Sequence, residues 1–112
     1  MSKKLFKNYT YEFDKNEAKI ISNFCKQAIK QMEDNSDFYK DVRAFESIMN
    51  KLDENPLEVK LTKDEKTRLV HQLTQNRDHL KKTLDKSGFI KKWFYKTLYT
   101  QYNNILTDKF ND

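Results

Sequence analysis

Few side chains in this sequence are of the types that act as nucleophiles or bind transition metals. The only cysteine is Cys25, and the only histidines are His71 and His79. Cys25 falls inside an apolar helical stripe, which favours a buried apolar residue over a reactive thiol. The two histidines are eight positions apart, about 80° around a helix. They do not converge as an i, i+4 metal pair would, so we expect exposed histidines and no zinc site.

One group of carboxylates could suggest a metal site. Asp34, Asp37 and Asp41 lie close together in the sequence, but Lys40 and Arg43 lie among them. No oxygen-rich loop with a glycine follows, as a calcium site requires. Helix capping accounts better for Asp34 and Asp37. We therefore expect no bound metal.

Glycine is too scarce for the common catalytic and nucleotide-binding loops. Gly88 is the only glycine and Pro56 the only proline among 112 residues. Phosphate-binding loops, dinucleotide fingerprints and nucleophile elbows all need glycines in their turns. The sequence predicts no cofactor and a protein that is not an enzyme.

The charge balance is basic but uneven. There are 22 basic and 17 acidic residues, giving a net charge of +5. Residues 30–56 are acidic overall, whereas residues 1–29 and 57–112 are basic. Only Arg43, Arg68 and Arg77 are arginines, and surfaces that clamp phosphates or bind base edges favour arginine. A solvated lysine surface accounts for much of the surplus.

The stretch 81–102 concentrates basic and aromatic side chains. Its lysines are Lys81, Lys82, Lys86, Lys91, Lys92 and Lys96, and its aromatic residues are Phe89, Trp93, Phe94, Tyr95, Tyr99 and Tyr102. On a helix starting at Phe89, helical spacing predicts a core face of Ile90, Phe94, Leu98 and Ile105, extended by Tyr95, Tyr102 and Leu106. Trp93 and Phe89 fall away from that face, beside Lys92 and Lys96.

Trp93 has three interpretations at this level. It could be buried, with its helix covered on two sides. It could be the aromatic anchor of a protein-binding surface with a charged rim. It could stack on an exposed base while lysines neutralise phosphates. The candidate binding residues are Phe89, Lys92, Trp93 and Lys96 with Lys81, Lys82 and Lys86.

Hydrophobic spacing defines the elements that must position these residues. Strict alternation predicts two short strands, residues 9–13 and 57–61, with Thr10, Glu12, Glu58 and Lys60 facing water. A period of 3.6 residues predicts four helices, ending near residues 33, 52, 87 and 108. The apolar stripe of the second helix begins at Phe38.

Capping residues set the helix boundaries. Asp14 with Glu17 and Thr62 with Glu65 have the spacing of capping boxes, so they predict the first and third helix starts. Pro56 stops the second helix. Gly88 is predicted to close the third helix as a left-handed C′ residue.

The predicted fold is mainly α: a four-helix, bundle-like single domain, residues 1–112, with a short two-stranded β-ribbon. The direction of the strand pairing stays open. Residues 9–17 resemble residues 57–65 after a shift of 48 positions. This suggests a pseudo-repeat of 9–52 and 57–108, although shared capping chemistry is an alternative explanation.

The third helix carries a narrow leucine seam that is interrupted by one polar residue. The seam consists of Leu69, Leu73, Asn76, Leu80 and Leu84. A polar residue in such a seam fixes register or pairing, so self-association is an alternative use of this helix.

The favoured function is that of a small non-catalytic cytoplasmic protein that binds another protein as a regulator, inhibitor or adaptor, of phage or mobile-element type. A nucleic-acid-binding module using Lys81–Lys96 is the alternative. A single cysteine is typical of a reducing compartment. No apolar run is long enough for a membrane span, so no membrane partner is expected.

Overall fold

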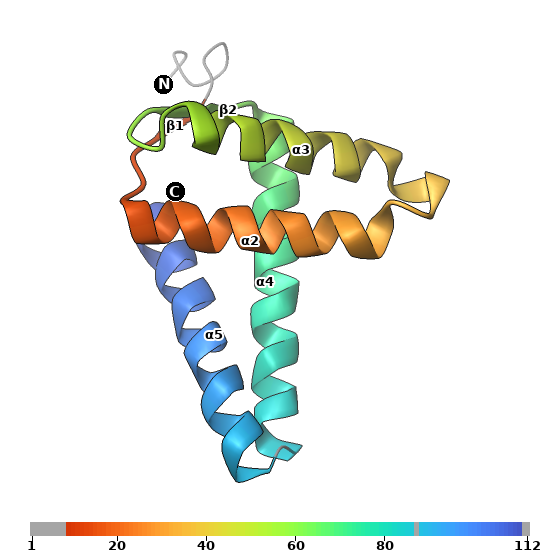
Figure 1. Ribbon diagram of the computed structural model, residues 1–112, viewed down its shortest axis with the longest axis vertical. Coiled ribbons are helices and arrows are strands. Elements are labelled where there is room, and N and C mark those ends of the chain that lie inside the picture. The colour runs from red at the N-terminus through yellow and green to blue at the C-terminus, as the bar shows by residue number, and fades with distance from the viewer. Residues whose placement is uncertain (1–8, 87, 111–112) are drawn as a thin grey trace. The chain divides into compact units, whose positions relative to one another are not determined.

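The computed structural model is mainly helical and divides into two compact units, Met1–Arg68 and Leu69–Asp112 (Figure 1). It describes residues 9–86 and 88–110, with the side chains of residues 85, 89 and 90 excluded. The described elements are β1 (Tyr9–Tyr11), α2 (Lys15–Met32), the 3₁₀ segment η1 (Ser36–Phe38), α3 (Tyr39–Glu54), β2 (Val59–Leu61), α4 (Lys63–Lys86) and α5 (Phe89–Lys109). The prediction of four α-helices with a short β-ribbon is confirmed within this part of the chain.

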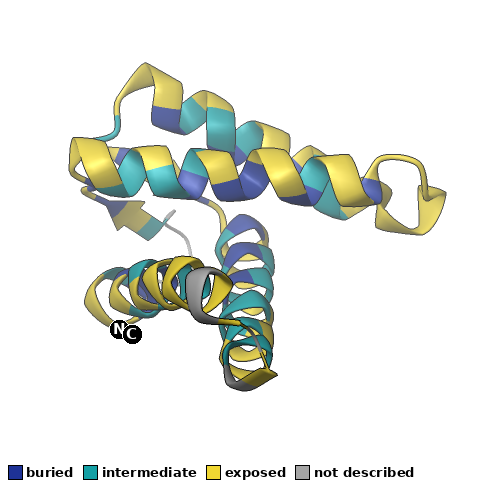
Figure 2. Cartoon of the chain, turned by 60° about the horizontal axis from the view of Figure 1, so that its bottom comes forward, coloured by how far each residue is buried: buried dark blue, intermediate teal, exposed yellow. Residues whose placement is uncertain are grey.

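The first unit is built on the pair α2 and α3, which lie side by side (Figures 1 and 2). Their apolar stripes face each other, and the rings of Phe24 and Phe45 meet edge to face with centroids 6.5 Å apart. Ile21, Cys25 and Ile48 are buried in the same core. Burial of each such side chain stabilises the fold by roughly 1.5–3 kcal/mol.

The two strands pair in antiparallel direction, with Tyr9 opposite Leu61 and Tyr11 opposite Val59. Alternation along the ribbon is confirmed, because Val59, Leu61 and Tyr11 are buried whereas the predicted water-facing residues are exposed. Leu57 was expected on the inner face and is 62% exposed. It lies in a turn, where the Asn55 side chain accepts a hydrogen bond from the Leu57 N–H at 3.1 Å, so the strand begins only at Val59.

Both predicted capping boxes are present. The Glu17 N–H donates to Asp14 Oδ1 at 2.7 Å, and the Asp14 N–H donates to Glu17 Oε1 at 2.9 Å. In the turn before α3, however, the cap is Asn35, whose Oδ1 accepts from the Asp37 N–H at 2.9 Å. The stretch 34–37 therefore supplies a cap as predicted, but Asn35 provides it, in place of Asp34 or Asp37, and it caps η1. The helix α3 itself begins after Phe38 without a side-chain cap, and Phe38 is 38% exposed.

The second unit contains α4 from Leu69 onward and α5. Figure 1 shows α4 and α5 close together where one leads into the other and farther apart at their opposite ends. The long side chain of Arg77 spans between them, donating to Asn103 Oδ1 at 3.2 Å. The buried residues that the structure describes in this unit lie close to this hydrogen bond or farther from Gly88 along the chain. They are Leu69, Leu73, Tyr102, Ile105, Leu106 and Phe110.

Gly88 does not adopt the predicted left-handed conformation. Its φ is −69° and its ψ is 171°, and it is the N-cap of α5. No described glycine has a positive φ. The chain reverses with an extended residue at this position, so the turn does not require the positive φ that glycine adopts more readily than other residues.

Candidate functional site

The residues with nucleophilic or metal-binding chemistry do not come together. Cys25 is fully buried in the first unit, and this burial raises the pKa of its thiol to about 12. His71 and His79 are exposed, as expected. Across residues 9–86 and 88–110, no three His, Cys, Asp or Glu side chains gather as metal ligands would.

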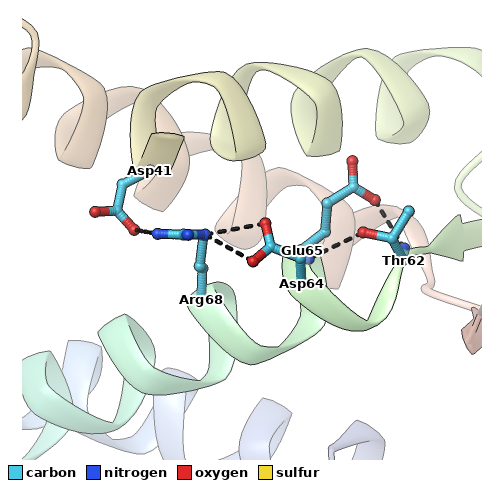
Figure 3. Close-up of polar contacts among 5 residues, drawn as sticks. All are labelled: Asp41, Thr62, Asp64, Glu65 and Arg68. Atoms are coloured by element: carbon cyan, nitrogen blue, oxygen red, sulfur yellow. Dashed lines mark hydrogen bonds and ion pairs between the residues drawn. The ribbon is translucent and has the colours of Figure 1, made fainter. Parts of the chain in front are cut away.

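An open groove of about 600 Å³ lies between α3 and the first turns of α4, and charged residues line it. Arg68 bridges its two sides: Nη1 donates to Asp41 Oδ1 at 2.6 Å, and Nε reaches Asp64 Oδ2 at 3.0 Å (Figure 3). These hydrogen bonds raise the pKa of Arg68, and its single positive charge is shared between the two carboxylates. The groove is a satisfied ion-pair network that holds α4 to α3.

Glu65 is the buried carboxylate next to this groove. Burial alone would raise its pKa, but hydrogen bonds from Lys51, Ser47 and the Thr62 N–H outweigh that effect and lower the pKa. Lys51 Nζ lies 2.6 Å from Glu65 Oε1, and the Thr62 N–H donates to the same oxygen at 2.9 Å (Figure 3 shows the Thr62 bonds). Glu65 therefore has a structural role.

The predicted binding residues gather at the hairpin tip, which we define as residues 80–86 and 88–98, the facing ends of α4 and α5. Trp93 is 72% exposed, which excludes the interpretation that it is buried. On an α-helix, with about 100° per residue, Trp93 points about 180° away from the buried Tyr102 and about 120° away from the buried Ile105. The side chain of Phe89 lies outside the described residues.

Phe94 was predicted on the core face and is instead 55% exposed. Its ring lies 5.8 Å from that of Tyr95, which is half-buried. Leu98, one turn further along, is half-buried, and full burial begins only at Tyr102. The apolar face of α5 thus starts outside the core, which helical spacing could not reveal.

The lysines of the hairpin tip are all exposed: Lys81, Lys82, Lys86, Lys91, Lys92 and Lys96. None of them forms an ion pair with another residue that the structure describes. The sequence has no Asp or Glu from residue 86 to residue 107. The tip also contains Asp85, so its six lysines leave it with a net charge of +5.

The start of α5 is electrostatically unfavourable for its own helix. Its N-cap, Gly88, provides no side-chain hydrogen bond, and the first turn contains no acidic residue. Lys91 and Lys92 lie near this end, where the helix dipole is already positive and cations destabilise the helix. Helix stability gives no reason for lysine at these positions.

The leucine seam of α4 is only partly buried. Leu69 and Leu73 are fully buried, whereas Leu80 and Leu84 are half-exposed. Asn76 Nδ2 donates to the Gln72 carbonyl oxygen of the same helix at 2.8 Å. This local bond satisfies one amide hydrogen within α4, and pairing with a second chain remains a prediction.

No known protein family, no curated protein and no solved structure matches this chain. Among the described helices, none combines the length and the apolar character that a membrane crossing requires.

Proposed function

We propose that this protein is a non-catalytic binding protein whose hairpin tip docks onto another protein. The observation that carries the proposal is the exposure of Trp93, at 72%, beside Phe94, at 55%. Single exposed apolar residues are ordinary on protein surfaces, but contiguous apolar patches mark interaction sites. Leu80, Leu84 and Leu98, which also belong to the tip, are half-exposed.

The residue types at the tip fit the composition of a protein interface. Tryptophan is enriched among residues that dominate binding energy, and polar or charged side chains commonly surround them and exclude water. Trp93 is flanked on its helix by Lys92 and Lys96. Burying the indole on a partner would remove a large apolar surface from water at little cost in side-chain entropy.

The other features of the chain support a role without catalysis in a reducing compartment such as the cytoplasm. Cys25, the only thiol, is buried and has a raised pKa, so it is a poor nucleophile. A single free cysteine is also typical of proteins that are kept reduced.

Replacement of Trp93 tests the proposal directly. We expect Trp93→Ser to abolish capture of the partner from extracts of the cells that produce the protein, because it removes the anchor. The free energy of unfolding should change by no more than about 0.5 kcal/mol, since the side chain is exposed. Affinity capture with mass spectrometry and urea unfolding measure the two effects.

Leu57→Ser is the matched control, because Leu57 is 62% exposed but lies in a turn of the first unit. It should retain every captured protein. The proposal fails if Trp93→Ser captures the same proteins as the wild type, or if it unfolds the protein.

Nucleic-acid binding is the second candidate, and the six exposed lysines of the tip favour it. It predicts capture that disappears after nuclease treatment. Its affinity would fall with salt by roughly 0.7–0.9 log units per log unit of salt for each phosphate contacted.

A further inference from the structure

We infer that the partner of the hairpin tip is a protein surface with acidic residues around an apolar centre. This inference rests on the proposed function and adds the chemistry of the partner. It distinguishes three occupants of the same surface: an acidic protein, a nucleic acid and a second copy of this chain.

Charge complementarity selects an acidic occupant. The tip carries six exposed lysines together with Trp93 and Phe94, and none of these lysines is ion-paired within the described part of the chain. A second copy docking tip to tip would place these lysines against one another, and like charges across an interface disfavour association. Carboxylates on a partner would compensate the lysines instead.

The arginines of this chain argue against a nucleic-acid partner. Bidentate recognition of phosphates favours arginine, and all three arginines are engaged away from the tip's lysines. Arg68 binds Asp41 and Asp64, and Arg77 reaches Asp78 and Asn103. Arg43 donates to the Tyr39 hydroxyl at 2.7 Å.

The apolar part of the tip also fits a protein better than a nucleic acid. Trp93 and Phe94 are consecutive, so they point about 100° apart around α5 and do not form a row on which successive bases could stack. Leu80, Leu84 and Leu98 are half-exposed. Aliphatic side chains match the apolar centre of a protein interface and contribute nothing to phosphate binding.

A panel of defined probes tests the inference on the full-length protein. The first probe is a labelled peptide of about 20 residues, long enough to form a helix, with glutamates around a leucine stripe. The second replaces the glutamates with glutamines. Single-stranded and duplex DNA of similar length complete the panel. Fluorescence anisotropy at about 0.15 M salt gives each affinity.

We expect the acidic peptide to bind about tenfold more tightly than the glutamine peptide or either DNA, since several charge pairs form at once. Trp93 is the only tryptophan, so its emission reports on the tip alone. That emission should shift to the blue as the indole leaves water. Light scattering should show a single chain before the peptide is added.

Two double lysine variants with the same change in charge test whether binding depends on the lysines of the tip. Lys92→Gln with Lys96→Gln should weaken binding of the acidic peptide about fivefold, because two surface pairs are lost. Lys26→Gln with Lys30→Gln changes the same charge, at the same spacing, on exposed positions of α2. It should leave the affinity unchanged.

The inference is overturned if DNA binds as tightly as the acidic peptide, if neither peptide binds, or if the two double variants lose affinity equally. A dimer that dissociates in Trp93→Ser would also overturn it and would assign the tip to a second copy. Trp93-dependent capture without binding of the acidic peptide would leave the proposed function standing and remove only the acidic partner.

Discussion

Glu65 illustrates how a single residue serves several elements of this fold. Its carboxylate accepts hydrogen bonds from the Thr62 N–H and from Lys51 Nζ, and it is 7% exposed. It completes the capping box of α4 and ties that helix to α3. A charged side chain at such a position stabilises the fold only while it stays ionised.

The lowered pKa of Glu65 predicts a pH-dependent contribution to stability. Because the folded pKa lies below the unfolded value of about 4.3, the contribution is present above that value. It is lost as the pH falls through the folded pKa. Glu65→Gln should therefore cost about 1 kcal/mol near neutral pH, and its difference from the wild type should shrink in acid. Urea unfolding at several pH values measures this, and a constant difference would contradict it.

Trp93 and Cys25 show opposite uses of side chains that the sequence marks as unusual. Cys25 is a fully buried residue of α2, and burial raises the pKa of its thiol, which suppresses its reactivity. Trp93 is exposed although it is the largest apolar side chain in the protein. Cys25, whose thiol could react, is part of the core, whereas Trp93, the proposed binding residue, is apolar.

At the scale of elements, helix starts differ in how well they are capped. α2 and α4 have complete capping boxes, whereas α5 starts at Gly88 without a side-chain cap. The first turn of α5 therefore leaves its N–H groups without a side-chain acceptor from the cap residue. This end of the helix is stabilised less than the other two.

Gly88→Ser tests the conformation of this turn. A serine can cap α5, and an added Cβ would meet nothing within 4 Å. We expect stabilisation by a few tenths of a kcal/mol, about 0.3. A left-handed Gly88 would instead make the substitution cost about 1 kcal/mol. Helix content by circular dichroism during urea unfolding distinguishes the two results.

At the scale of the whole molecule, burial is distributed unequally between the two units and along the second. The core of the first unit includes Phe13, Ile21, Phe45 and Ile48, each almost completely buried. Among the residues of the second unit whose side chains are described, the fully buried ones lie within 69–73 and 102–110, and none lies in the hairpin tip. Local stability should follow this distribution.

Hydrogen exchange should reveal this gradient. Amides of α2 and α3 near Ile21 and Phe45 should exchange at least about a hundredfold more slowly than those of residues 91–96, because opening the tip exposes little apolar surface. Exchange measured by mass spectrometry or NMR on the intact protein gives both rates. Equal protection in the two regions would show that the tip is held as firmly as the core.

Local chemistry allowed much of the secondary structure to be predicted from the sequence. The capping boxes at Asp14 and Thr62 and the alternation at residues 9–11 and 59–61 depend on neighbours within a few positions, and the structure confirms them. The errors at Leu57 and Gly88 also concern single turns. At Leu57, the Asn55 side chain stabilises a turn in place of the expected strand. At Gly88, an extended backbone replaces the expected left-handed helix cap.

The sequence by itself determined a mainly helical fold with a short ribbon, and it identified the residues that gather at the hairpin tip. Only the tertiary structure decided that the strands are antiparallel, that Arg68 bridges two carboxylates and that Phe94 is exposed. Helical spacing shows which side chains share a face. It does not show where along the helix a neighbouring element stops covering that face, because coverage depends on residues that are distant in the chain.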